Sequence, residues 1–289
     1  MDATIAALVL ASAALHPIRD LIVKKIHFRE SAYIGITASW ILISAIHATL
    51  TQGNVYLPFS LLPMIVFSSF GLVLYYVGIT VSLRQGELSV YYPIIRSSPL
   101  FIVAVNFLVF GHSYAAITLT GIVLAVAGAF FIQYQRGAGL FDKPYLFTVA
   151  AIAMAGHGIT TLADAKAMRL VEPAAFLFWT YLLTLFTQLA WFQCTKPEGR
   201  LSLQHIAGAW GSNPVRVLLA GSLSYLSYVF IMTAFQLGGE AAAVTAVRQA
   251  SIPISVLLGV FILREGNLGS RLSWSMVLAG GIAIIVFVK

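Results

Sequence analysis

Residues 91–101 read "YYPIIRSSPLF" and place an arginine, Arg96, between two prolines inside an apolar block that runs from 88 to 110. A block of this length is long enough to cross the hydrocarbon core of a bilayer as a helix, which takes about 20 residues. A charged side chain at the centre of a membrane helix costs about 2.5–3.5 kcal/mol on insertion scales. We therefore expect Arg96 to face an aqueous cavity or a partner inside a helical membrane protein.

Apolar blocks of this kind recur along the chain, which is 60% hydrophobic and only 9% charged. A soluble domain carries roughly 25% charged residues, so this chain lacks the polar side chains to cover a water-exposed surface. The blocks show no alternation of period two, which excludes a membrane β-barrel. We predict an all-α polytopic protein, multi-pass in the cell (inner or plasma) membrane. Its ten predicted transmembrane helices are 3–23, 32–50, 59–83, 88–110, 115–134, 145–167, 174–193, 214–237, 241–263 and 270–288.

The net charge of +7 comes from basic residues that gather on one side of the predicted membrane. The opposite side carries only Lys166, Arg169 and Lys289. Because basic loops stay in the cytoplasm, this bias places the loops after odd-numbered helices inside and both termini outside, and it explains the charge without nucleic acid. The basic residues in or beside those loops are Lys24, Lys25, Arg29, Arg84, Arg136, Lys143, Lys196, Arg200, Arg216, Arg264 and Arg271. Those left inside predicted helices are Arg19, Arg96 and Arg248.

The chain repeats itself at an offset of 153 residues, where 70–130 matches 223–283. Tyr75 falls on Tyr228, and Arg96 misses Arg248 by one position. Chance similarity among apolar segments is the alternative, and matches at charged and aromatic residues weigh against it. Each copy holds five helices, so we predict two inverted repeats, residues 1–137 and 138–289, with a site at the midplane between them. The other matches are Thr80 with Thr233, Gly86-Glu87 with Gly239-Glu240, Ser98 with Ser251, Gly128 with Gly281 and, at a shorter offset, His16 with His157.

Over nearly its whole length, the chain resembles the EamA-type members of the drug/metabolite transporter superfamily. The resemblance lies in the five-plus-five helices, the mid-helix proline of each fourth helix, and the final helices "GIVLAVAGAFFI" and "VLAGGIAIIVFV". The second repeat keeps an acidic residue after its fourth helix, Glu265 in "LREG", where the first repeat has His112 in "FGHS". The opening "LHPIRDLIVKK" looks like a diverged His-plus-Asn pattern, with Arg19-Asp20 in place of neutral residues.

The resemblance implies carrier-mediated transport of small organic solutes by alternating access. It implies a central cavity lined by the first, third and fourth helices and their counterparts in the second half. Substrates of the superfamily range over amino acids, nucleotide sugars, organic phosphates, choline-like amines and drugs. Members generally keep both termini in the cytoplasm, an expectation that disagrees with the charge bias of this chain.

Arg96 and Arg248 are the leading candidates for substrate contact, because each lies near the middle of a predicted helix. A guanidinium group offers a planar fork of donors suited to a carboxylate, phosphate or phosphonate. The prolines that follow, Pro99 and Pro253, remove backbone hydrogen bonds and loosen each helix beside its arginine. The alternative is a structural ion pair, for example with Asp20 or Asp164. The substrate-binding candidates are Arg96, Arg248, Tyr75, Tyr228, Tyr92, Gln249, Ser224, His16 and His157.

Asp20 and Asp164 are the candidates for a protonatable group that couples transport to protons, whereas an exchanger would use a counter-substrate and need neither. Two histidines without paired carboxylates make a poor metal site, so we expect no metal and no cofactor. The sequence has no Gly-Lys dipeptide and hence no P-loop, which excludes an ATP-driven pump for this chain. It also lacks a Gly-x-Ser-x-Gly nucleophile motif, and we expect no enzyme activity.

The predicted function is secondary transport, without ATP, of a small anionic or zwitterionic metabolite. The alternatives are an exporter of amino acids or of amphipathic or cationic compounds, an intramembrane enzyme, and a membrane partner subunit that does not transport. The expected partners are a small-molecule substrate, protons or a counter-substrate, and the lipid bilayer. We expect the chain to work as a monomer or a homodimer.

Overall fold

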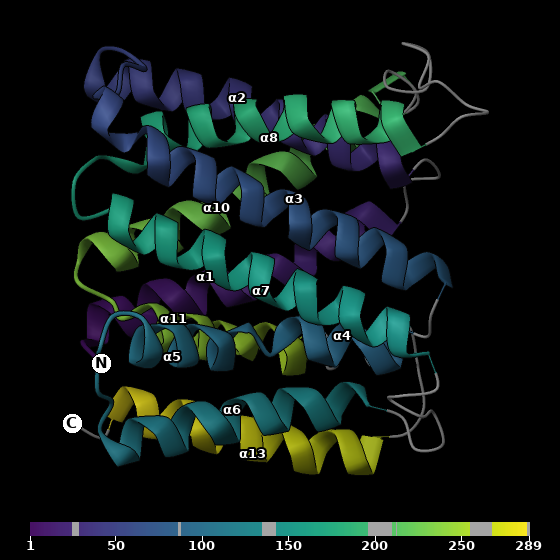
Figure 1. Ribbon diagram of the computed structural model, residues 1–289, viewed down its shortest axis with the longest axis vertical. Coiled ribbons are helices and arrows are strands. Elements are labelled where there is room, and N and C mark those ends of the chain that lie inside the picture. The colour runs from purple at the N-terminus through teal and green to yellow at the C-terminus, as the bar shows by residue number, and fades with distance from the viewer. Residues whose placement is uncertain are drawn as a thin grey trace.

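The computed structural model describes residues 1–24, 29–85, 88–134, 143–195, 210–211, 213–254 and 268–287. The described residues form helices and no strands, and the helices follow the apolar blocks of the sequence (Figure 1). The helices are α1 (Ala3–Lys24), α2 (Arg29–Gln52), η1 (Phe59–Leu61), α3 (Leu62–Gln85), α4 (Leu88–Arg96), α5 (Ser98–Leu108), α6 (Ala116–Gln133), α7 (Pro144–Ala167), α8 (Pro173–Thr195), α10 (Pro214–Gln236), α11 (Ala241–Val247), η2 (Arg248–Ala250) and α13 (Leu268–Phe287).

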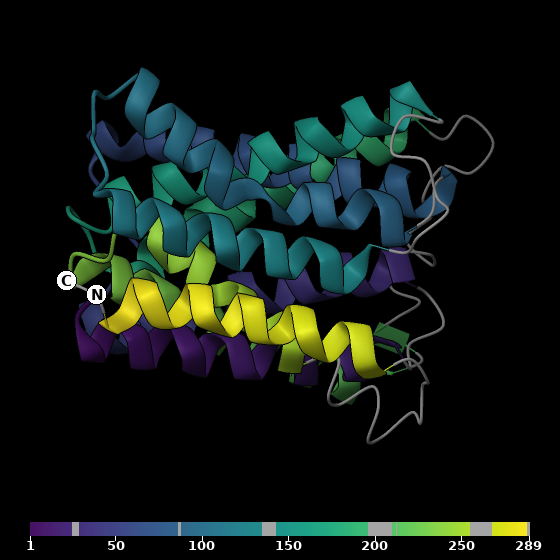
Figure 2. The ribbon, with the colours of Figure 1, turned by 90° about the horizontal axis from the view of Figure 1, so that it is seen from below.

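The helices lie side by side in an elongated bundle and run between the same two ends of the molecule (Figures 1 and 2). The strongest packing pairs are α3 with α7, α1 with α10, α6 with α13, and α2 with α8. In Figure 1, α2 and α8 form the upper edge of the bundle and α6 and α13 form the lower edge. The short elements α4, α5, α11 and η2 lie between these edges and contact α7, α1 and α6.

Five stretches of the described chain are long and apolar enough to cross a membrane. Large apolar side chains point outward from them, such as Phe67 and Phe186, with exposed fractions of 58% and 62%. Exposed apolar surface of this kind suits contact with lipid tails and not with water. The helices therefore indicate a membrane protein, as the composition predicts. The five stretches are Ile34–Thr51, Phe59–Ser82, Pro144–Ala167, Pro173–Trp191 and Pro214–Gln236.

Small residues allow the central helices to approach each other closely, as is common between membrane helices. A Cβ atom added to Gly156 on α7 would lie 2.7 Å from the carbonyl oxygen of Gly71 on α3. On the other side of the bundle, Ser12 of α1 and Ser227 of α10 share a hydrogen bond of 2.9 Å between their hydroxyl groups. These two crossings place α3, α7, α1 and α10 together in the interior.

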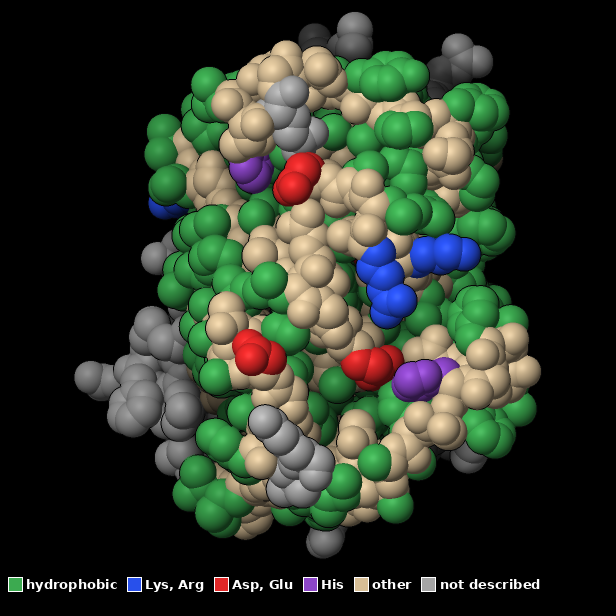
Figure 3. Space-filling view, turned by 90° about the vertical axis from the view of Figure 1, so that its left-hand side faces the viewer, with side chains coloured by type: hydrophobic (Ala, Val, Ile, Leu, Met, Phe, Trp, Pro, Cys, Tyr) green, Lys and Arg blue, Asp and Glu red, His purple; other side chains and the backbone are tan. Residues whose placement is uncertain are grey.

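Both ends of the described chain lie at one end of the bundle (Figure 1). The amino group of Met1 donates hydrogen bonds to the carbonyl oxygens of Ile285 and Val286, at 3.1 and 3.3 Å. The connections α2–η1, α5–α6, α7–α8 and α10–α11 lie at this same end, which faces the viewer in Figure 3. Few charged side chains lie on this face (Figure 3). The exposed Arg169 and Glu172 belong to the connection between α7 and α8.

Glu240 fixes one of these connections, that between α10 and α11. Its carboxylate accepts hydrogen bonds from the backbone N–H groups of Ala242 and Ala243 at the start of α11, at 3.0 and 2.8 Å. It also accepts hydrogen bonds from the Tyr114 hydroxyl at 2.8 Å and the Asn106 amide at 3.2 Å. The first residues of α11 are therefore tied to the last turn of α5 and to the loop between α5 and α6.

The predicted helix 88–110 breaks at Ser97 into α4 and α5. Pro99 has no N–H to donate to the carbonyl of residue 95, so the helical hydrogen-bond ladder cannot continue there. Ser97 lies at φ −77° and ψ 14°, and its hydroxyl donates to the Pro93 carbonyl at 2.9 Å. In the predicted helix 241–263, α11 tightens into the 3-10 helix η2 at Arg248; residues 255–267, and with them the end of this predicted helix, lie outside the described residues. The loosening that the prolines predict is confirmed at Arg96.

Candidate functional site

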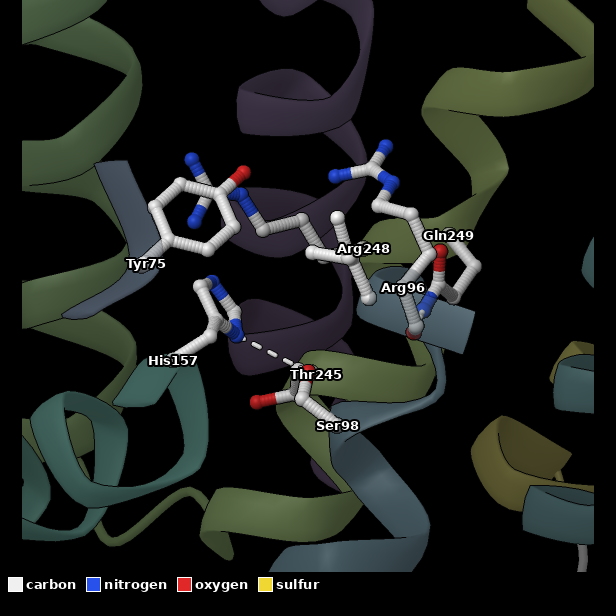
Figure 4. A pocket seen from close by; sticks show the side chains of 8 residues that line it. Tyr75, Arg96, Ser98, His157, Thr245, Arg248 and Gln249 are labelled. Carbon is white, nitrogen blue, oxygen red and sulfur yellow. Dashed lines mark hydrogen bonds between the residues drawn. The ribbon is translucent and has the colours of Figure 1, made fainter. Parts of the chain in front are cut away.

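The break between α4 and α5 and the 3-10 turn η2 face the same cavity (Figure 4). The cavity is small in this structure, with a volume of about 10 Å³, which is room for about one water molecule. In Figure 4, Tyr75 and His157 lie on one side of the cavity, Arg96 and Gln249 on the other, and Arg248 extends between them toward Tyr75. The lining residues are Tyr75, Ile95, Arg96, Ser98, His157, Thr245, Arg248 and Gln249.

Within the described residues, the close contacts of the two arginines are hydroxyl and aromatic groups and not carboxylates. Arg96 donates from Nη2 to the Ser251 hydroxyl at 2.9 Å, and its guanidinium lies 5.7 Å from the centre of the Tyr92 ring. The Arg248 guanidinium lies 5.4 Å from the centre of the Tyr228 ring. Aromatic faces attract cations but leave the donor fork able to bind an anion. The cavity therefore holds two guanidinium groups with donors directed toward neutral neighbours.

Gln249 joins the two sequence halves at the helix break. Its amide donates to the backbone carbonyl of Arg96 at 2.5 Å, which satisfies an acceptor that the interrupted helix leaves over. Two buried polar atoms beside this contact, Arg96 Nε and Gln249 Oε1, have no hydrogen-bond partner among the described residues. Buried polar atoms are normally paired, so these two point to a bound molecule or ordered water in the cavity.

The close crossing of α3 and α7 at Gly71 and Gly156 brings Tyr75 and His157 together. The ring centres of Tyr75 and His157 lie 5.0 Å apart. His157 Nδ1 and the Ser98 hydroxyl share a hydrogen bond of 2.8 Å, drawn as the dashed line in Figure 4. This bond ties α7 to the first residue of α5, directly after the break. His157 thus holds the edge of the cavity in place and presents its ring to it.

His16 and Arg19 lie one turn apart on α1 and bring a further cation to this region. Arg19 Nη2 donates to His16 Nε2 at 2.9 Å. His16 lies within electrostatic reach of Arg96 and Arg248 as well as Arg19. The charge of the described residues around the cavity is therefore strongly positive.

Asp164 is completely buried on α7, with an exposed fraction of 1%. Its Oδ1 atom accepts a hydrogen bond from the Ser68 hydroxyl at 2.6 Å, and its Oδ2 atom accepts one from the Tyr228 hydroxyl. Tyr228 thus contacts this carboxyl group through its hydroxyl and the Arg248 guanidinium through its ring. Tyr228 itself packs against Trp40, with ring centres 5.3 Å apart.

The predicted substrate-binding residues divide into three groups in the structure. Tyr92, Tyr228 and His16 lie directly behind the two arginines or beside them. Ser224 is buried on α10 one turn before Tyr228 and does not line the cavity. Asp20, which is a candidate for proton coupling and not for substrate binding, has its side chain outside the described residues. Those that line the cavity are Tyr75, Arg96, His157, Arg248 and Gln249.

Ser98, Thr245 and Ile95 also line the cavity but are absent from the sequence-predicted set. A signal for two of them is present in the sequence. Ser98 matches Ser251 in the repeat, and Thr245 lies three residues before Arg248 on one helical face. No described group of three or more His, Cys, Asp or Glu side chains could hold a metal ion.

Comparisons with known proteins give information on the fold alone. No family model matches the sequence, and no curated protein matches it. Among 29 solved chains with a similar structure is one described only as "Crystal structure of protein", which is 15% identical in sequence. It matches with a TM-score of 0.74, over 99% of this chain and 98% of that chain. The helical arrangement is therefore one that occurs in solved structures.

Proposed function

We propose that the protein is a secondary transporter of a small organic metabolite that bears a carboxylate, phosphate or phosphonate group. The observation that carries this proposal is the pair Arg96 and Arg248, which come from distant parts of the chain and line one interior cavity. Both arginines are partly buried, and holding two partly buried cations at one cavity is costly unless something pairs with them. An anion from solution, bound between the two donor forks, offsets this cost.

The packing pattern supports an arrangement of ten membrane helices in two inverted repeats. Exchanging the two repeats turns the pair α3–α7 into α10–α1, and both pairs are among the strongest in the bundle. The same exchange turns α2–α10 into α8–α3, and both pairs are in contact. The pairs α2–α8 and α6–α13 turn into themselves. This pattern, together with the sequence resemblance, supports our proposal that the chain is an EamA-type drug/metabolite transporter.

The interrupted helices at the cavity support alternating access. Transporters with inverted repeats use discontinuous helices at the midplane to bind substrate. Here the break at Ser97 and the turn η2 at Arg248 each place an arginine at the cavity. The hydrogen bond from Gln249 to the Arg96 carbonyl is one of several at the cavity that join the two repeats. A substrate that binds both arginines would strengthen this join, and its release would weaken it.

The nature of the charges favours an anion over a cation as substrate. A cation is bound by carboxylates or by the faces of aromatic rings; no described residue that lines the cavity is acidic, and the Tyr92 and Tyr228 rings already lie against the two guanidinium groups. Asp164 bonds to the Tyr228 hydroxyl and does not line the cavity. A zwitterion fits if its carboxylate binds the arginines and its ammonium group faces Tyr75 or Ser98.

The proposal is tested by ligand-dependent thermal stability of the purified protein in detergent. Two anions are each paired with an uncharged analogue that lacks the anionic groups: succinate with succinamide, and glycerol 3-phosphate with glycerol. We expect at least one anion to raise the melting temperature, because ligands that bind only the folded state stabilise it. Its neutral analogue and the Arg248→Ala protein with the same anion are expected to show no rise. Equal stabilisation by the neutral compounds would contradict an anion site.

A further inference from the structure

Asp164 is the buried carboxyl group that the anion site leaves unexplained. It lies on α7 inside a stretch that is apolar enough to cross a membrane, and it is 1% exposed. Placing a carboxyl group there is costly, and hydroxyl donors from Ser68 and Tyr228 hold it. A structural role alone would be met by a neutral side chain such as asparagine. The presence of an acid points to a group that changes its charge.

The surroundings of Asp164 contain one cation and several phenols. On α3, Ser68 donates a hydrogen bond to Asp164. Tyr76 of the same helix interacts electrostatically with Tyr228 and Tyr181. The α8 helix contributes Tyr181, and α10 contributes Tyr228. Arg248 of η2 is the charged side chain that acts on Asp164 among the described residues. The helices α4, α5 and α11, which also pack on α7, add no ionisable described group that acts on it.

Tyr228 connects the buried acid to the anion site through two different contacts. Its hydroxyl donates a hydrogen bond to Asp164, and its ring lies under the guanidinium of Arg248. The distance from the ring centre to Arg248 Cζ is 5.4 Å. The charge of Asp164 therefore reaches Arg248 both through space and through the position of the Tyr228 ring. When Asp164 is ionised, its charge partly balances that of Arg248. When it is protonated, the charge of Arg248 is left for a bound anion.

We propose that Asp164 is the proton-binding site of the carrier and that Tyr228 couples it to anion binding at Arg248. The proposal rests on the proposed function and specifies its driving ion. A hydronium ion gives its proton to a carboxylate oxygen of Asp164 and leaves as water, and no other covalent bond forms or breaks. Protonation strengthens anion binding and, because coupling is reciprocal, anion binding strengthens protonation. Proton and anion then cross the membrane together.

The proton site is tested first without any substrate, by infrared difference spectroscopy of the protein in lipid between pH 5 and pH 9. We expect a carboxylic-acid band that appears as the pH falls and is absent from Asp164→Asn. Arg248→Gln removes the nearby cation, so the carboxylic-acid band is expected to appear at a higher pH. In the exposed control Arg169→Gln, the band is expected to appear at the same pH as in the wild type. The proposal would be overturned if the wild type showed no pH-dependent carboxylic-acid band, or if the same band remained in Asp164→Asn.

Coupling is tested by uptake of the anion panel (succinate, glycerol 3-phosphate and glutamate) into proteoliposomes, with and without an inward proton gradient. We expect the gradient to raise uptake by about tenfold, within the usual range of coupling. Asp164→Asn, which mimics the protonated acid, is expected to exchange the anion without responding to the gradient. Tyr228→Phe keeps the ring and is expected to lose the response, while the matched Ser68→Ala keeps it.

These outcomes separate the two proposals. If uptake needs both arginines but ignores the gradient in the wild-type protein, the coupling is refuted and the anion site stands. If no anion of the panel is carried, the proposed function fails, and the infrared result alone decides whether Asp164 binds a proton. A gradient response of Asp164→Asn equal to that of the wild type would overturn the coupling in either case.

Discussion

At the scale of single residues, the environment of Arg96 is set by what the break in its helix leaves unpaired. The break exposes the Arg96 carbonyl, and Gln249 from the other half of the chain donates to it. The guanidinium of the same residue turns toward Ser251 and the cavity. One residue thus serves two purposes, since its backbone joins the two halves and its side chain supplies charge to the site.

Replacing Gln249 with leucine is expected to destabilise the protein by about 1–3 kcal/mol, the cost of a buried group left without a partner. The leucine removes the donor to the Arg96 carbonyl while keeping a side chain of similar volume. The measurement is the melting temperature of the purified protein, and the matched control is Gln236→Leu, where the amide is only partly buried and donates at 3.2 and 3.4 Å. Equal melting temperatures for wild type and Gln249→Leu would contradict this role.

Some residues of the site follow from the sequence, and others depend on tertiary contacts. Arg96 and Arg248 are predictable because a charged side chain inside an apolar block costs free energy, so the few such residues stand out as candidates for function. The partners of Asp164 are not, since Ser68 and Tyr228 lie 96 and 64 residues away from it along the chain. Only the crossing of α3, α7 and α10 brings these three side chains together. Asp164 alone predicts a titratable group without saying to what it is linked.

At the scale of the helices, small residues decide which elements can meet. The crossing of α6 and α13 depends on Gly281, because an added Cβ there would lie 2.7 Å from the carbonyl oxygen of Gly121. The neighbouring Gly280 faces open space, with nothing within 4 Å of an added Cβ. The two adjacent glycines therefore make a matched pair for measuring what close packing contributes.

Gly281→Ala is expected to lower the stability of the protein by about 1–3 kcal/mol, the usual cost of overpacking a tight contact. Gly280→Ala is expected to leave it unchanged or slightly higher, since alanine favours the helix. Thermal unfolding of both variants in the same detergent measures the difference. A larger loss for Gly280→Ala than for Gly281→Ala would show that the described crossing is wrong.

The helix boundaries show where sequence patterns are sufficient. The predicted block 145–167 and α7 (Pro144–Ala167) differ by one residue, because apolar length alone sets such an element. The block 88–110 is one unit by composition, and its division at Ser97 depends on Pro99 and on Ser97 bonding to the Pro93 carbonyl. Proline marks the place of a break but not its geometry.

At the scale of the whole molecule, the pairing of helices ties the two ends of the chain to one end of the bundle. The Met1 amino group and the carbonyl of Ile285 lie 3.1 Å apart. Fusing a reporter that works on one side only, either to the N-terminus or to the C-terminus, is expected to report the same side in both cases. The charge bias predicts that this side is the outside. If the two fusions reported opposite sides of the membrane, the contact between the start of α1 and the end of α13 would be wrong.

The central claim is that Arg96 and Arg248 together bind a transported anion, and uptake into proteoliposomes tests it most directly. The measurement compares uptake of the anion panel (succinate, glycerol 3-phosphate and glutamate) by wild type, Arg96→Ala, Arg248→Ala and the exposed control Arg169→Ala, at equal protein content in the membrane. We expect the wild type and the control to carry the same anion and each of the first two variants to lose at least nine tenths of that uptake. Full uptake by either Arg96→Ala or Arg248→Ala would contradict the account.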